Sequence, residues 1–274
     1  MKIYTVEEIL NKLENCIKYR LPFSHIRFGD GGIKFIHSIL FKDFEQLNII
    51  IRKEGLPKEE IVNFFEMWGY YARRADFIDT PEVYSSDKFW PRLRSPKKTI
   101  TRKTRQRLEM WRTLYYRAEF DNENYCNPES NYLMILRRNK KNLLDLMKNR
   151  KVCVITAAPK VGGILRSYGY DVEIVEIVGH YQQQYVRSFE NVVRKIKDKA
   201  NHYDFWLVAA GELGRLYSGL IKENGGRTVD IGFVIEFWMG QDIHPRLLPF
   251  MCRSVDNKLE LKLKDGGKKY DEFL

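Results

Sequence analysis

The chain has 274 residues, 44% of them hydrophobic and 30% charged, which predicts an ordinary soluble protein with a substantial core. No stretch approaches the ~20 apolar residues of a membrane span, and the N-terminus carries acids where a signal peptide needs an apolar segment. The four cysteines are scattered without the close pairing of a zinc site, which fits a reducing compartment, so we expect a cytoplasmic protein. The formal net charge is +11, and it is concentrated in one segment.

The N-terminal region predicts a helix, a short strand and a glycine-rich turn. Thr5–Ile17 opens with a capping box and continues with an apolar stripe at helical spacing. Ser24–Phe28 alternates like a strand and ends in Gly29–Gly32, after which another helix is expected. An acid in a glycine turn at a strand end is exposed, so we expect Asp30 to be a site residue. The alternative is a structural role, in which Asp30 pairs with Arg27 or caps the next helix.

Residues 43–148 predict a mainly helical region with a strongly basic part. Between Lys88 and Arg117 the chain carries eleven basic residues and one acid, a local net charge of +10. Aromatic residues lie among these charges, as in surfaces that stack bases or sugars while holding phosphates. The alternative is a solvated helical face, but we expect an anionic partner here. The residues expected to contact it are Arg102, Lys103, Arg105 and Trp111.

The second half of the chain predicts strands that alternate with helices. The predicted strands are Lys151–Thr156, Val172–Val178, Phe205–Ala210 and Thr228–Ile235. This alternation implies an α/β fold around a Rossmann-like, mainly parallel sheet. We expect residues 1–274 to form a single domain, with residues 43–148 as a helical subdomain or insertion within it.

Ligands of such sheets bind at the carboxyl ends of the strands, where helix N-termini face an anion. Gly211 directly follows the strand Phe205–Ala210 and precedes a helix, so we expect a nucleotide phosphate at this turn. Lys160 and Arg215 also follow strand-to-helix turns. We expect them to pair with phosphate, the alternative being that they are solvated surface residues.

Four further residues are candidates at the same edge. Glu212 is either a catalytic group or a favourable partner of the helix dipole. His180 follows a strand and is at the correct end of the sheet for a ligand. Asp230 lies in an apolar strand, where a carboxylate needs partners, so it either organises the fold or contacts the donor. Glu236 follows the same apolar run.

Two separated stretches resemble one family. Residues 25–31, HIRFGDG, look like the RFGDGE signature of bacterial GT-D-fold glycosyltransferases. Residues 207–214, LVAAGELG, followed by residues 229–232, VDIG, are similar to the second characteristic region of that family. The resemblance implies a GT-D-like, Rossmann-like core and a transferase that uses a nucleotide sugar as its donor substrate.

Three positions depart from the family pattern. Gly32 stands where the family has the Glu of a DxE metal motif, Phe233 where it has a His, and Glu212 where it has a Pro. Two groups able to hold a hard cation are therefore missing. We assign no metal ligand and expect weak or no use of Mn²⁺ or Mg²⁺. Glu212, Glu236 and His180 are candidates to replace the missing groups, but the sequence does not show that any of them does.

These observations predict a glycosyltransferase that moves a sugar from a nucleoside diphosphate donor to an acidic or polyanionic acceptor. The resemblance favours an envelope glycan or lipid-linked intermediate as acceptor, whereas the basic segment favours DNA with a hydroxylated base, as in phages. The alternative is a non-catalytic nucleotide- or nucleic-acid-binding protein of the same fold. The sequence does not indicate an oligomeric state.

The candidate site residues fall into three roles. Asp30 would accept the proton of the acceptor hydroxyl, with Glu212 and His180 as further catalytic candidates. The basic segment would contact the acceptor. The expected donor-binding residues are Arg27, Gly29, Gly31, Lys160, Gly211, Arg215, Asp230 and Glu236.

Overall fold

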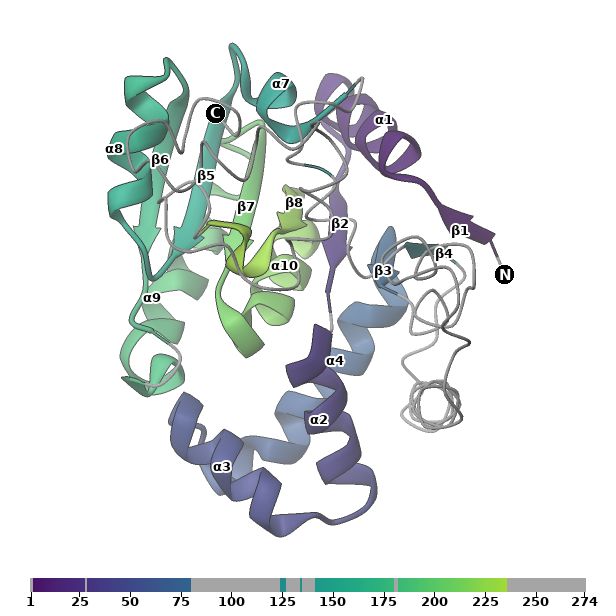
Figure 1. Cartoon of the computed structure of the whole chain (residues 1–274), viewed down its shortest axis with the longest axis vertical. Helices are drawn as coiled ribbons and strands as arrows, with labels where there is room; N and C mark the ends of the chain where they lie inside the picture. The colour runs from purple at the N-terminus through teal and green to yellow at the C-terminus, as the bar shows by residue number, and fades with distance from the viewer. Residues whose placement is uncertain are drawn as a thin grey trace, which may run out of the picture.

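The structure is a computed structural model that describes residues 2–27, 29–79, 124–126, 134, 141–179 and 182–235 (Figure 1). Within these ranges eight strands form one sheet, in the order β1-β4-β3-β2-β8-β7-β5-β6, and every neighbouring pair is parallel. The strands are β1 (Lys2–Tyr4), β2 (Phe23–Ile26), β3 (Phe77–Asp79), β4 (Asn124–Cys126), β5 (Lys151–Thr156), β6 (Asp171–Glu176), β7 (Phe205–Ala209) and β8 (Arg227–Asp230). The predicted α/β class with a parallel sheet is confirmed.

Helices cover both faces of this sheet. Those before β3 are α1 (Val6–Lys18), α2 (Gly29–Leu40), α3 (Phe44–Glu54), the 3-10 turn η1 (Lys58–Glu60) and α4 (Ile61–Arg74). Those after β4 are α7 (Leu143–Met147), α8 (Lys160–Ser167), α9 (Gln184–Lys199), η4 (Gly211–Leu213), α10 (Gly214–Glu223) and η5 (Gly232–Val234). The predicted capping box is confirmed, because Glu8 N donates to Thr5 Oγ1 and Thr5 N donates to Glu8 Oε2.

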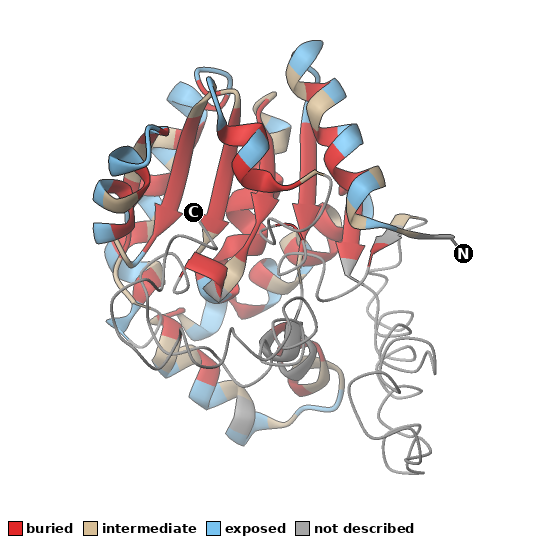
Figure 2. Ribbon diagram, turned by 45° about the horizontal axis from the view of Figure 1, so that its top comes forward, coloured by how far each residue is buried: buried red, intermediate tan, exposed pale blue. Residues whose placement is uncertain are grey.

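The central strands β2, β8, β7 and β5 are buried on both faces, as a covered parallel sheet requires, whereas the edge strand β6 is partly exposed (Figure 2). Successive side chains point to opposite faces: Phe205 and Leu207 join the cluster under α1, α7 and α8, whereas Trp206 and Val208 join the cluster under α4, α9 and α10. Every residue from Gly214 to Ile221 of α10 is buried. Helix α10 is therefore a central element, enclosed by the sheet on one side and by α4 and α9 on the other.

In the described part of the chain, the strand order creates a point where the chain leaves neighbouring strands in opposite directions. From β5 the chain continues to the edge strand β6, whereas from β7, the other neighbour of β5, it continues to β8. Open α/β sheets bind ligands at the carboxyl ends of strands at such points. Helices α2 and α3 extend beyond this carboxyl edge (bottom of Figure 1).

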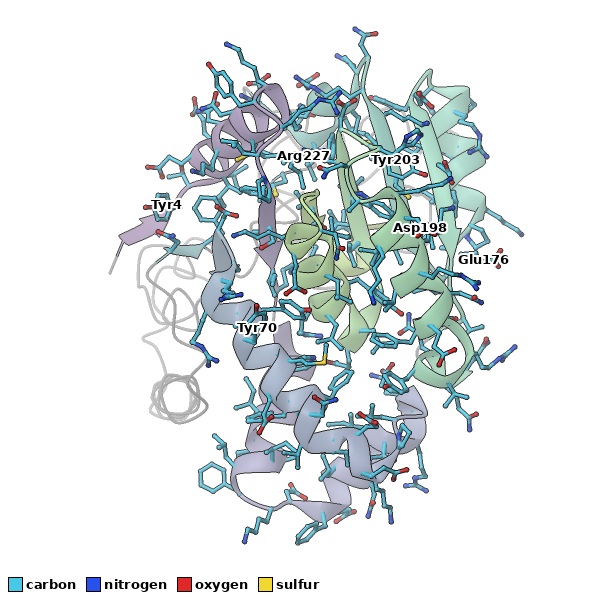
Figure 3. All side chains as sticks on the ribbon, turned by 180° about the vertical axis from the view of Figure 1, so that it is seen from behind. Tyr4, Tyr70, Glu176, Asp198, Tyr203 and Arg227 are labelled. Atoms are coloured by element: carbon cyan, nitrogen blue, oxygen red, sulfur yellow. The ribbon has the colours of Figure 1, made fainter. Side chains whose placement is uncertain are left out.

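A buried cation lies at the opposite, amino-terminal edge of the sheet. Arg227, the first residue of β8, is 1% exposed, and it donates from Nη2 to the carbonyl of Tyr203 at 2.8 Å and from Nε to that of Asp204 at 2.7 Å. Figure 3 shows Arg227 and Tyr203 at one end of the sheet and Glu176, the last residue of β6, towards the other. Arg227 therefore links the start of β8 to the residues just before β7 and has a structural role.

The structure corrects several predicted element bounds. Residues 43–148 are not purely helical, since they supply β3 and β4 to the sheet, and β1 is a further strand that the pattern did not predict. Helix α2 begins at Gly29, so Asp30 lies in a helical first turn, where an acid is electrostatically favoured, instead of at the tip of a loop. Strand β8 ends at Asp230 and is followed by η5. The division into one domain with an insertion stays a prediction.

No helix in the described part of the chain is long and apolar enough to cross a membrane. The helix predicted from about Thr101 to Arg117, like the whole basic segment, lies outside the described residues. The same is true of everything after Ile235, including the alternating run Lys258–Lys264.

Candidate functional site at the carboxyl edge of the sheet

Helices that begin at the carboxyl edge include α2 after β2, α8 after β5, and α10, through η4, after β7. No side chain caps the N-terminus of α8, η4 or α10 by a hydrogen bond. The first amides of a helix carry partial positive charge, and side-chain caps otherwise satisfy them. Some of these amides donate to nearby carbonyls, such as Val161 N to Ala158 O and Gly214 N to Gly211 O, and the helix N-termini present their positive dipole ends at this edge, which favours an anion.

The Gly211 turn, residues 210–214, is fixed from the interior of the protein. Gly211 has a φ of 54°, in the left-handed region that favours glycine. Arg215 Nη1 donates to the carbonyl of Gly211 at 3.1 Å and to Glu212 Oε2 at 2.8 Å. The Arg215 guanidinium lies 4.6 Å from the ring centre of Trp68 in α4. The turn is thus tied to α4 through one arginine.

This geometry bears on two predicted site residues. Arg215 and Glu212 are 6% and 8% exposed and are paired with each other, so Arg215 is not the solvated surface residue that was its alternative. Both side chains are buried, and the hydrogen bonds of Arg215 to Gly211 and Glu212 hold the turn in place. Gly211 itself is exposed, and its contact with a donor phosphate stays a prediction.

The ends of β2 and β8 bring the two resembling stretches together. His25 of β2 is paired with Val229 of β8. Gly232 has a φ of 52°, and a Cβ atom added there would lie 2.3 Å from Arg27 Nη1, so the Arg27 side chain lies directly against this glycine. Segments some 200 residues apart in the sequence are therefore one structural unit.

Asp230 organises this unit. Its side chain is buried, and Oδ1 accepts a hydrogen bond from the amide of Gly232 at 3.0 Å. A Cβ atom added to Gly214 would lie 3.6 Å from Asp230 Oδ2, so the carboxylate also lies beside the start of α10. Of the two roles predicted for Asp230, the described contacts support the structural one.

His25 lies in the stretch that resembles the family signature, but its contacts are those of a structural residue. It is fully buried, its Nε2 lies 3.4 Å from Cys126 Sγ, and it is hydrogen-bonded to the backbone of Asp230. Burial, and then the positive charge of Arg27, lowers the pKa of His25 to about 3. The ring is therefore neutral at physiological pH and ties β2, β4 and β8 together.

Lys160 is an exposed cation at this edge. It is the first residue of α8, after a turn in which Thr156 Oγ1 accepts a hydrogen bond from Ala158 N at 3.0 Å. A lysine at a helix N-terminus opposes the helix dipole, and a bound anion removes that conflict. The position of Lys160 agrees with the predicted contact to phosphate.

For other predicted residues the structure describes the backbone alone or nothing. The backbone of Gly29, Asp30 and Gly31 forms the first turn of α2, at the carboxyl end of β2. Their roles in catalysis and donor binding stay predictions. The predicted residues outside the described ranges are His180, Glu236, Arg102, Lys103, Arg105 and Trp111.

The described residues leave metal binding open. Among them, no group of three or more His, Cys, Asp or Glu side chains could hold a metal ion. The side chains of His180 and Glu236, two of the three candidates to replace the missing metal-binding groups, lie outside that set, as does the side chain of Asp30. The expected weak use of divalent metal stays a prediction.

Sequence reasoning missed one residue near the site, Glu54. It is the last residue of α3 and only 1% exposed. Burial, and then the negative charge of Glu212, raises the pKa of Glu54 to about 8. A glutamate before Gly55 and Pro57 has the sequence pattern of an exposed helix end, so no local signal predicted its burial.

The comparison with known families adds an independent observation. The sequence model of a family described as GT-D-like, a GT-D fold-like domain, matches residues 96–238. The match contains β5 to β8 and the turns after them, but it does not contain residues 25–31. No curated protein and no solved structure gave a significant match to the chain.

Proposed function

The chain belongs to the GT-D fold-like domain family, and from this premise we propose that it is a glycosyltransferase that uses a nucleoside diphosphate sugar. One observation carries the proposal: the matched range contains β5 and β7, and the uncapped helix N-termini after them lie at the point where the chain diverges. This is the position at which α/β sheets bind nucleotide phosphates.

The donor diphosphate would lie against the backbone amides of the Gly211 turn. Gly211 has no side chain, so phosphate oxygens can approach the backbone closely. Lys160, exposed at the start of α8, and Arg27, at the end of β2, are the cations that the described part of this edge offers to a leaving diphosphate. Electrostatic stabilisation of that leaving group is a main requirement of glycosyl transfer.

The proposed reaction is a displacement at the anomeric carbon of the sugar. The acceptor hydroxyl forms a bond to this carbon, the bond from the carbon to the diphosphate oxygen breaks, and the nucleoside diphosphate leaves with the bonding electrons. The acceptor proton passes to a general base, for which we propose Asp30, because it lies in the first turn of α2 at the same edge. Glu212 is less suited, since it is buried and paired with Arg215.

We further propose that the acceptor carries phosphate, because residues 88–117 have a net charge of +10. A lipid-linked envelope intermediate and DNA with a hydroxylated base share this chemistry. The two acceptors differ in composition, because the envelope intermediate carries a lipid and DNA does not. Binding of lipid-free DNA to the protein would therefore distinguish them.

The proposed activity is tested by incubating the protein with radiolabelled nucleotide sugars and candidate acceptors, with Mn²⁺ or after exhaustive chelation. We expect label to appear in the acceptor, and we expect chelation to leave most of the rate, since Gly32 and Phe233 replace two metal-binding groups of the family. Complete loss on chelation, restored by Mn²⁺, would contradict the second expectation. Nucleotide binding without any transfer would identify the non-catalytic alternative.

A further inference from the structure

Glu54 is a buried carboxyl group without a hydrogen bond in the described part of the chain. Its side chain is 1% exposed, and neither Oε1 nor Oε2 has a hydrogen-bond partner there. The nearest cation is Lys53, whose Nζ lies 3.9 Å from Glu54 Oε1. An ionised carboxylate in such a place is strongly disfavoured, whereas the protonated acid is tolerated. The structure therefore favours a neutral Glu54.

The groups that face Glu54 come from three elements. Lys53 belongs to its own helix α3, Glu212 to η4, and Arg215 and Tyr217 to α10. Tyr217 is fully buried, and burial followed by the charge of Glu54 raises its pKa. From α9, contact comes through uncharged residues that pack against the residue after Glu54, Gly55.

Arg215 links this junction to the Gly211 turn. Its Nη1 holds both Glu212 Oε2 and the carbonyl of Gly211, so the shape of the turn depends on where the guanidinium lies. While Glu54 is neutral, Glu212 has no competitor for this cation among the facing groups. If Glu54 loses its proton, two buried carboxylates face one guanidinium, and the repulsion between them favours a shift of Arg215 towards Glu54.

We propose that protonated Glu54 is a positioning residue for the donor loop: it leaves Arg215 to Glu212 and Gly211, and release of its proton to solvent loosens the Gly211 turn. The burial of the carboxyl group and its lack of a hydrogen bond carry this inference, and the pKa of Glu54 near 8 agrees with it. Its consequence for donor binding rests on the proposed function, whereas its consequence for the turn does not.

The test measures hydrogen exchange of the Gly214 amide, which donates to the carbonyl of Gly211, without ligand, between pH 6 and pH 9. After correction for the intrinsic effect of pH, the protection factor in the wild type should fall by about tenfold or more above pH 8. Glu54→Gln and Glu54→Met, which cannot ionise, should keep high protection at every pH. The control Glu66→Gln removes an exposed charge from α4 and should behave as the wild type.

Two results would overturn the proposal: the same pH-dependent loss in both Glu54 variants, or a constant protection factor in the wild type. The proposal would also be contradicted if the Glu54 variants had at pH 6 the low protection factor that the wild type has at pH 9, because a side chain that cannot ionise should keep the turn in place. Titration with uridine diphosphate at pH 6.5 and 8.5 then separates the two claims. If exchange follows the expected pattern but neither uridine diphosphate nor other nucleoside diphosphates bind, the proposed function fails and the positioning role stands.

Discussion

Single residues at the carboxyl edge have separable roles in the proposed site, because some would present backbone to a ligand and others hold that backbone in place. Gly211 belongs to the first kind, with a left-handed φ and no side chain. Arg215, Glu212 and Asp230 belong to the second, since each is buried and bound within the protein. Substitutions in the two groups should therefore differ in their effect on stability and on affinity.

Replacement of Gly211 should weaken donor binding more than it weakens the fold. In Gly211→Ala the left-handed conformation costs about 1–2 kcal/mol, and the methyl group keeps phosphate from the backbone. We expect the affinity for nucleoside diphosphate, measured by calorimetric titration, to fall at least about tenfold.

The matched control for this variant is Gly163→Ala. Gly163 lies in α8 near the same edge, and a Cβ atom there meets nothing within 4 Å. This change should leave affinity unaltered and raise stability by roughly 0.5–1 kcal/mol. Equal affinity in both variants would place the donor elsewhere.

Asp30→Asn should abolish transfer while donor binding persists. The amide keeps the shape of the side chain but cannot take a proton from the acceptor, so turnover should fall by ~10² or more. The control Asp171→Asn changes an exposed acid at the start of β6, at the other edge of the sheet, and should leave turnover unchanged. Near-normal turnover of the Asp30 variant would end its assignment as the base.

At the scale of elements, the junction of α3 with α10 makes stability depend on pH. The pKa of Glu54 is about 8 in the folded chain and near its ordinary value of 4.5 in the unfolded chain. The folded state therefore holds a proton that the unfolded state releases between these values. The corresponding stability is present below pH 4.5 and is lost as the pH rises to about 8.

Glu54→Gln removes this dependence. By urea unfolding, the variant should match the wild type at pH 4.5 and be up to about 4 kcal/mol more stable at pH 8. Glu66→Gln should follow the wild type throughout. A difference between wild type and Glu54→Gln that stays the same from pH 4.5 to pH 8 would show that Glu54 is ionised in the folded protein.

Elements that are buried along their whole length could be predicted from sequence, because their apolar runs are local. Strand β5 has the predicted bounds Lys151–Thr156, and the turn at Gly211 was predicted from the glycine after β7. Strands β3 and β4 could not be predicted, since three residues are too few to show a period. The Glu212–Arg215 pair and the burial of Glu54 also could not, because they depend on how α3 and α4 pack against α10.

At the scale of the whole molecule, two different regions are proposed to bind the two substrates, the donor and the acceptor. The described carboxyl edge is proposed to bind the donor, and the basic segment of residues 88–117 is proposed to bind the acceptor. Donor and acceptor binding should therefore respond to different mutations.

Replacement of Arg102, Lys103 and Arg105 by Gln tests the acceptor proposal. If the acceptor is DNA, binding should weaken for all sequences, and the slope of log affinity against log salt should flatten by about one unit for each phosphate that the variant no longer neutralises. Nucleotide affinity should not change. A triple variant of Lys12, Lys18 and Arg20, exposed residues in and just after α1, removes the same charge and should have little effect. Undetectable DNA binding by the wild type at low salt would leave the envelope acceptor.

The central claim is that a nucleoside diphosphate binds at the carboxyl edge between β5, β7 and the helices that follow them. It is tested most directly by hydrogen exchange with and without a bound nucleoside diphosphate. We predict that the nucleotide slows exchange in residues 157–162 and 211–216 and leaves residues 200–204 and 224–227, at the amino edge, unchanged. Slower exchange at the amino edge alone, or no protection at the Gly211 turn with nucleotide bound, would contradict the account.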